Sequence, residues 1–104
     1  MIVKCYRYRV RPNVVAEYLQ LQRRVAEVFG QAGCLRSLIL RPQNGEEWLD
    51  LMFFQSEEQI GEVERRAEEL GAGELYERFL RLTGLQSDEI EQQVYVCAVD
   101  SDDL

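Results

Sequence analysis

The sequence contains no histidine and only three cysteines. Histidine is the commonest acid–base group and metal ligand near neutral pH, so its absence excludes the usual serine-hydrolase triad. Cys5, Cys34 and Cys97 form no C-x-x-C pair, and we expect small buried side chains rather than a disulfide framework or a zinc site. No glycine-rich nucleotide motif is present either, and we expect neither a metal nor a cofactor.

Long apolar runs and an excess of basic residues are also missing. No segment approaches the roughly 20 apolar residues that span a bilayer. The first residues, Met1 to Arg7, lack the apolar block of a signal peptide, so we expect a cytoplasmic protein without a membrane partner. Twelve basic residues face 19 acidic ones, and the net charge of −7 disfavours binding to a phosphate backbone. We therefore expect no nucleic-acid partner.

The chain has 104 residues, which predicts one domain over 1–104 with a frayed tail at 100–104. Alternating patterns predict strands over 2–10, 34–41, 48–55 and 90–99. Helical spacing covers 14–29, 57–70 and 74–82, with a break at 71–73. Asn13 and Ser56 are suited to cap the first two helices.

A hairpin is predicted where Asn44-Gly45 separates two strand patterns, because both residues tolerate the positive φ of a type I′ turn. Leu40 then faces Leu49. One side of this hairpin is apolar and collects Leu38, Leu40, Leu49, Leu51 and Phe53. The other side is mixed and collects Ser37, Ile39, Arg41, Trp48, Asp50, Met52 and Phe54. We expect the helices to cover the apolar side.

The order β-α-β-β-α-β predicts a ferredoxin-like α+β fold. Both helices lie on one face of a four-stranded antiparallel sheet of order 4-1-3-2. We expect the other, mixed face to be buried in a homodimer, with Trp48 anchoring the partner and stacked against Arg41. Asp50 either pairs with an arginine there or serves as a lone base. The predicted dimer-face residues are Arg41, Trp48, Asp50, Met52 and Phe54.

Three segments carry a family resemblance: Tyr6–Pro12 leading into a helix, Gly33–Leu35 opening a strand, and Phe53–Glu58 joining a strand to a capped helix. In this order and spacing, the whole chain resembles the dimeric α+β barrel superfamily. It is most similar to the antibiotic biosynthesis monooxygenase-like (ABM-like) domains. The resemblance implies a homodimer with a small-molecule cleft between helices and sheet.

Two activities are implied by the resemblance: cofactor-independent oxygenation of aromatic molecules and oxidative degradation of haem. The haem-degrading branch uses an asparagine, a tryptophan and a haem-ligating histidine. Tyr6 and Val63 stand near the first two positions, and the chain has no histidine, which disfavours haem degradation.

Tyr6 and Arg7 are the candidate catalytic residues, since a phenol can polarise an aromatic substrate and a guanidinium can stabilise an oxyanion. A structural role remains open for each, as strand tyrosine or solvent-facing arginine. The candidate cleft residues are Tyr6, Tyr8, Phe53, Val63, Tyr76 and Phe79.

Two functions stay open at this point. One is a monooxygenase that acts on a hydrophobic aromatic substrate without a cofactor. The other is a non-catalytic homodimer that binds a small hydrophobic ligand or serves a structural role on the same scaffold. A regulatory ligand-sensing domain is the weakest alternative, because no DNA-binding helix-turn-helix accompanies the pattern.

Overall fold

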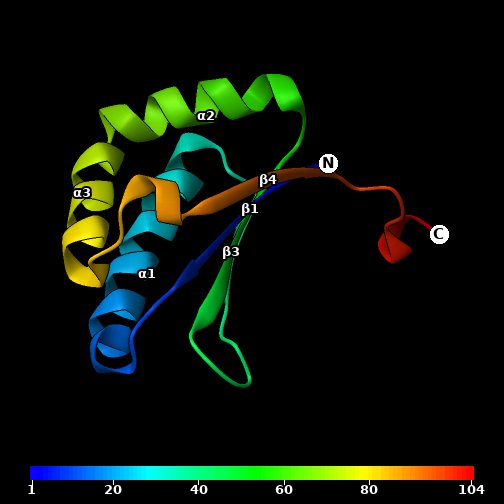
Figure 1. Ribbon diagram of the computed structural model, residues 1–104. Coiled ribbons are helices and arrows are strands. Elements are labelled where there is room, and N and C mark those ends of the chain that lie inside the picture. Colours follow the sequence, from blue (N-terminus) through cyan, green and yellow to red (C-terminus); the bar gives the residue numbers. More distant parts are fainter.

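A four-stranded antiparallel sheet forms one layer of the computed structural model, which describes all 104 residues. The strands are β1 (Ile2–Arg9), β2 (Arg36–Leu40), β3 (Glu47–Phe54) and β4 (Glu91–Val96). Their order across the sheet is β2-β3-β1-β4. This is the predicted order 4-1-3-2 read from the opposite edge, so the ferredoxin-like α+β fold is confirmed. The last strand is shorter than predicted, and the chain after it extends away from the body (Figure 1).

Three helices form the second layer, and Figure 1 shows all of them on the same side of the sheet. They are α1 (Val15–Ala32), α2 (Glu57–Glu69) and α3 (Ala72–Thr83). None has the length and apolar composition needed to cross a membrane. The predicted break between α2 and α3 occurs at Gly71, whose φ of 98° is a left-handed conformation that suits glycine.

The helix starts differ in detail from the capping prediction. Residues Pro12–Val14 form a 3-10 turn, and α1 begins after it without a side-chain cap from Asn13. Proline explains this start, because its fixed φ and missing N–H suit the first turn of a helix. Ser56 does occupy the N-cap position of α2, but its side chain makes no capping hydrogen bond.

The β2–β3 hairpin has the predicted register, with Leu40 opposite Leu49 and Leu38 opposite Leu51. The predicted type I′ turn is wrong, because Asn44 does not have a positive φ. A longer connection at residues 41–46 joins the strands. Pro42 has no N–H for a hairpin ladder. The carbonyl of Glu46 accepts a hydrogen bond from Val10 N at 2.9 Å, which ties the connection to the end of β1 instead.

The two faces of the sheet are the reverse of the sequence prediction. In a single chain Trp48 is 3% exposed and Phe54 1% exposed, and Asp50 and Met52 are also buried, all beneath the helices. Arg41 lies at the edge of this covered face, with its guanidinium 5.5 Å from the Trp48 ring centroid. The five predicted dimer-face residues therefore lie on the wrong side of the sheet. The prediction failed because it assumed that a polar residue such as Asp50 avoids the core, whereas a buried carboxyl is tolerated when it has a hydrogen-bond donor.

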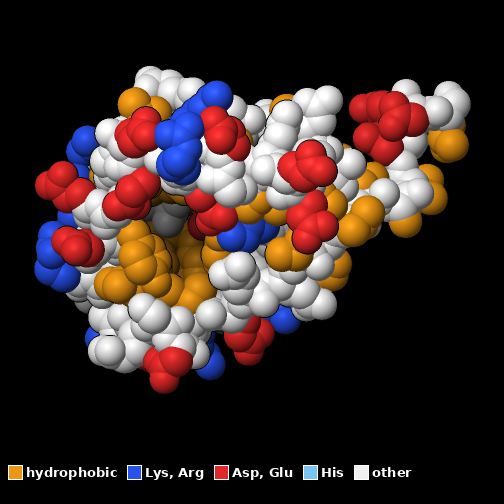
Figure 2. Space-filling model, turned by 90° about the horizontal axis from the view of Figure 1, so that it is seen from above, with side chains coloured by type: hydrophobic (Ala, Val, Ile, Leu, Met, Phe, Trp, Pro, Cys, Tyr) orange, Lys and Arg blue, Asp and Glu red, His pale blue; other side chains and the backbone are white.

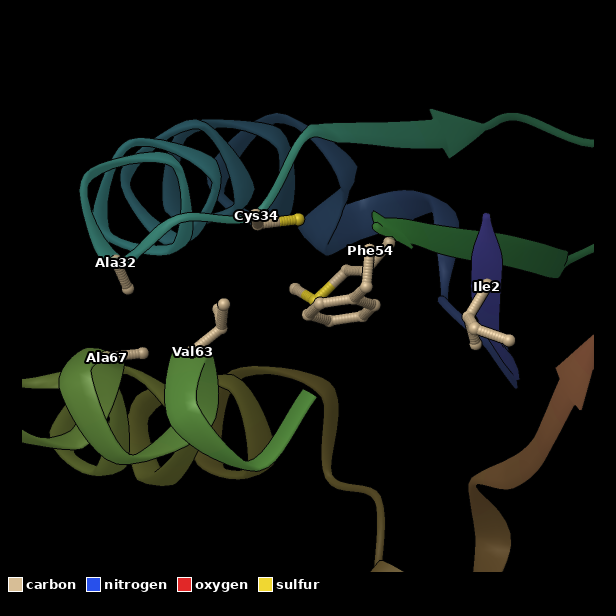
Figure 3. Close-up of a cluster of buried hydrophobic side chains, with 7 residues drawn as sticks. Ile2, Ala32, Cys34, Phe54, Val63 and Ala67 are labelled. Atoms are coloured by element: carbon tan, nitrogen blue, oxygen red, sulfur yellow. The ribbon is translucent and has the colours of Figure 1, made fainter. Parts of the chain in front are cut away.

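Two hydrophobic clusters fill the space between sheet and helices. The first joins α1, α2 and the ends of β1 and β3 (Figure 3), and contains Ile2, Ala32, Cys34, Met52, Phe54, Val63 and Ala67. The second joins α1, α3 and the other ends of the strands, and contains Tyr8, Val10, Tyr18, Leu21, Trp48, Leu75 and Phe79. Tyr6, Val25 and Val28 pack against both clusters. The space between the clusters is not completely filled.

Candidate functional site

A cavity of about 280 Å³ lies between the two clusters, under the helices and above β1 and β3. Ten of its fifteen lining residues are hydrophobic. The space-filling view shows a hollow with hydrophobic walls and charged side chains around its mouth (Figure 2). Its aromatic lining consists of Tyr6, Tyr8, Phe29, Tyr76 and Phe79. Its polar lining consists of Gln22, Asp50, Glu64 and Glu68. A concave, mostly apolar space with a few polar groups is typical of a small-molecule site.

The floor of the cavity follows from strand alternation and register. Side chains at every second position of a strand share a face, so Tyr6 and Tyr8 of β1 point toward the helices. Tyr6 lies directly opposite Asp50 of β3 in the ladder. The two strands thus place phenol and carboxyl groups side by side on the floor.

Asp50 is a carboxyl group buried on the floor of the cavity. Its Oδ2 accepts a hydrogen bond from the Tyr8 hydroxyl at 3.3 Å, and the Tyr8 oxygen lies 2.5 Å from the hydroxyl of Tyr18. Burial raises the pKa of Asp50 to about 6, although the Tyr8 hydrogen bond opposes the shift. The carboxyl group therefore changes charge close to neutral pH, as a general base does.

Tyr8 and Tyr18, the two tyrosines hydrogen-bonded in series with Asp50, stay protonated. Burial raises the pKa of both Tyr8 and Tyr18, and the charge of Asp50 adds to the shift in each case. Since Tyr8 donates to Asp50, Tyr18 donates to Tyr8. The edge-to-face contact between the two rings, with centroids 6.0 Å apart, helps to hold this geometry.

A second polar group lies beside Tyr6. The ammonium of Lys4 is 3.1 Å from Glu64 Oε2 of α2 and 5.5 Å from the centroid of the Tyr6 ring. Burial opposes the charge of Lys4, but Tyr6 and Glu64 outweigh it and its pKa is raised. Burial also raises the pKa of Tyr6, and the hydrogen bond and charge of Lys4 oppose that shift. Lys4 therefore remains a cation and Tyr6 a neutral phenol.

Four of the six residues predicted for the cleft line the cavity: Tyr6, Tyr8, Tyr76 and Phe79. Phe53 does not, because it points to the open face of the sheet, opposite Val3. Val63 does not either, because it is buried in the cluster between α1 and α2 (Figure 3).

Of the two predicted catalytic residues, Tyr6 lies at the cavity and Arg7 lies on the opposite face of the sheet. Arg7 Nε is 3.0 Å from Glu47 Oε1, and its Nη1 is 3.9 Å from Glu91 Oε2. The alternation of β1 directs Arg7 away from the helices, so it cannot stabilise an oxyanion in the cavity.

Several lining residues were missed at the level of sequence. Gln22 is buried on the apolar side of α1, four residues after Tyr18, and a polar side chain in an apolar stripe was the signal for it. Glu64 and Glu68 gave no such signal, because nothing distinguishes them from the other charged residues of α2. No group of three or more Cys, Asp or Glu side chains is placed to hold a metal ion.

No family model and no curated protein matches the sequence. Solved structures do. A proposed antibiotic biosynthesis monooxygenase from Deinococcus radiodurans is similar with a TM-score of 0.70 at 15% identity, over 96% of this chain and 95% of that one. SnoaB, a cofactor-independent oxygenase from Streptomyces nogalater, gives a TM-score of 0.67 at 18% identity, over 96% and 95%. The chain has the ABM-like fold.

A third structure is a dimeric ferredoxin-like protein from an uncultured marine organism, with a TM-score of 0.72 at 12% identity over 95% of this chain and 89% of that one. These identities are too low to carry an activity from one chain to another. The ABM-like fold thus confirms the resemblance seen in the sequence, and function depends on the cavity itself.

Proposed function

We propose that this chain binds a hydrophobic, hydroxylated aromatic molecule in the cavity and oxygenates it without a cofactor. The observation that carries the proposal is a buried carboxyl group, Asp50, whose pKa of about 6 places its titration near neutral pH on the floor of an aromatic cavity. An ionised Asp50 removes the proton of the bound ring, and the resulting electron-rich anion reacts with O₂.

The reaction balances without an external reductant. The step requires a hydroxylated aromatic substrate with an activated CH₂ group next to its aromatic rings, as in an anthrone. That CH₂ group becomes a carbonyl; one oxygen atom of O₂ enters the product, and the other leaves as water with the two hydrogens of that carbon. All the electrons come from the substrate. The aromatic walls orient the ring, while the Tyr6 hydroxyl and the Gln22 amide are placed to hydrogen-bond its oxygen atoms. SnoaB, a cofactor-independent oxygenase, is an example of this fold with that class of chemistry.

We also propose that the chain is a homodimer formed through the open face of its sheet. No helix covers this face (Figure 1). Its central side chains are apolar and partly exposed: Val3, Leu38, Leu49, Leu51 and Phe53. A flat apolar face of this kind is self-complementary under two-fold symmetry. Each subunit keeps its own cavity, because the cavity is on the other side of the sheet.

Oxygen consumption tests the oxygenase. The purified protein is mixed with hydroxylated aromatic compounds that carry an activated CH₂ group, such as dihydroxyanthrone, and O₂ uptake is followed without added cofactor. We expect Asp50→Asn to reduce the rate by about 10²–10⁴-fold, the usual contribution of a general base. Arg7→Ala is the matched control and leaves the rate unchanged, because Arg7 lies on the open face.

The alternative function is a non-catalytic ligand-binding dimer, and the same samples distinguish it. No uptake by any compound, together with thermal stabilisation by one of them, supports the binder and contradicts the oxygenase. Uptake that persists in Asp50→Asn contradicts the role given to Asp50. If no compound produces either thermal stabilisation or O₂ uptake, both functions are contradicted.

A further inference from the structure

Carboxylates predominate among the charged groups of the cavity. Asp50, Glu64 and Glu68 all line it, and no basic residue does. The nearest cation, Lys4, is already paired with Glu64 at 3.1 Å. Above pH 6, where Asp50 ionises, the site has an excess of negative charge that no side chain compensates.

Glu68 is the carboxylate free to meet a ligand. It takes part in none of the ion pairs of the chain. Its carboxylate rests against Gly73 at the start of α3, where a Cβ would lie 2.7 Å from Oε1. Because Gly73 has no side chain, the Glu68 carboxylate has space to lie beside the cavity.

Aromatic rings lie at the same cavity. Tyr76 and Phe79 of α3 line it and stack with centroids 6.2 Å apart, and Tyr76 is half exposed. An ammonium group is attracted both by a carboxylate and by the faces of aromatic rings. Asp50 is buried while Glu68 is exposed, so the cavity is polarised from a proton-accepting floor to an anionic mouth.

We infer that the cavity selects aromatic ligands that carry a positively charged amine, which Glu68 binds at the mouth while the ring enters between Tyr6 and Phe79. The inference rests on the proposed function and specifies its substrate class. A ligand carboxylate would add another negative charge to a site where those of Asp50 and Glu68 are already uncompensated, and so be repelled.

Three catechols whose side chains differ in charge test the inference: dopamine, 4-methylcatechol and 3,4-dihydroxyphenylacetate, which are cationic, neutral and anionic. Their Kd values are measured by calorimetry at pH 7.5 without oxygen. We expect dopamine to bind at least about tenfold more tightly than the anionic compound, with 4-methylcatechol between them. Equal binding of all three, or tighter binding of the anion, would overturn the inference.

Two variants locate the selectivity. Glu68→Gln is expected to reduce the preference for dopamine about fivefold or more and to leave 4-methylcatechol unaffected. Gly73→Ala is expected to act in the same direction, because the new methyl group displaces the Glu68 carboxylate without changing any charge. Glu58→Gln is the matched control: it changes the net charge by the same amount as Glu68→Gln, at an exposed position at the start of α2 away from the cavity.

If Glu58→Gln and Glu68→Gln shift the preference equally, the selectivity comes from the overall charge and the role of Glu68 is wrong. Binding of 4-methylcatechol separates this inference from the proposed function. If the neutral compound binds without any preference for the amine, only the inference fails. If none of the three binds, the ligand site fails and the inference with it.

Discussion

The covered and open faces of the same sheet follow opposite rules. The covered face holds the polar residues Lys4 and Asp50 among aromatic rings, whereas the open face presents mostly aliphatic side chains at its centre. From polarity alone, the polar residues would be expected on the open face and the aliphatic residues under the helices. The difference teaches that a polar strand residue can be buried when a neighbouring element supplies its partner, as Tyr8 does for Asp50 and Glu64 for Lys4.

The largest difference between the faces is expected in the stability of the single chain. Trp48→Ala removes a buried ring that packs edge-to-face on Tyr18, with centroids 5.1 Å apart. We expect a loss of about 3–5 kcal/mol in the free energy of unfolding, measured by urea denaturation. The control is Leu40→Ala on the partly exposed outer side of β2, with a loss below about 1 kcal/mol. Equal losses at the two positions would contradict the assignment of the faces.

The open face is expected to control association of the chain. Leu51→Lys places a charge at the centre of the open face, and we expect the dimer to weaken by about 100-fold or more, since a desolvated charge at a symmetric interface meets its own copy. Sedimentation velocity over a dilution series measures this. The cavity remains intact, so binding of 4-methylcatechol by the monomer is the control. A wild-type chain that stays monomeric at high concentration would refute the dimer.

The smallest of these effects is a pH-dependent one on the covered face. The pKa of Asp50 is raised from 3.8 to about 6, so the folded chain holds this proton more tightly than the unfolded chain. The contribution of Asp50 to stability is therefore greatest below pH 4 and decreases as the pH rises through 6. We expect Asp50→Asn to be more stable than the wild type at pH 8, by on the order of 2 kcal/mol.

At pH 4 this stability difference should disappear, because the wild-type carboxyl is then neutral. Paired urea titrations of the two proteins at pH 4 and pH 8 measure it, and other titrating groups cancel in the comparison. A variant that is less stable than the wild type at pH 8 would show that the carboxylate is stabilised rather than destabilised by its surroundings.

The sequence was sufficient to predict the element order, the sheet order and the hairpin register. These depend on local periodicity, and the alternation around Leu49 and Leu51 fixes the register even though the turn at Asn44 was wrong. Which face of the sheet the helices cover could not be predicted from local periodicity. It depends on Tyr8, whose hydroxyl donates to Asp50 of β3 and lies against the hydroxyl of Tyr18 of α1.

The candidate site was only partly predictable for the same reason. Tyr6 and Tyr8 were found because strand alternation places them on one face. Arg7 was included because a guanidinium can stabilise an oxyanion, but strand alternation sends its side chain to the other side of the sheet. Glu68 could not be found, because its place at the cavity depends on how α2 meets α3 at Gly71.

The most direct test is a carboxyl carbon NMR titration of Asp50, alone and with saturating 4-methylcatechol. We expect a midpoint near pH 6 that rises further in Tyr8→Phe, since the Tyr8 hydrogen bond lowers the pKa of Asp50, and that shifts when the catechol binds. A midpoint near the ordinary aspartate value of 3.8, insensitive to both Tyr8 and the catechol, would contradict the role of Asp50 as the proton acceptor of this cavity.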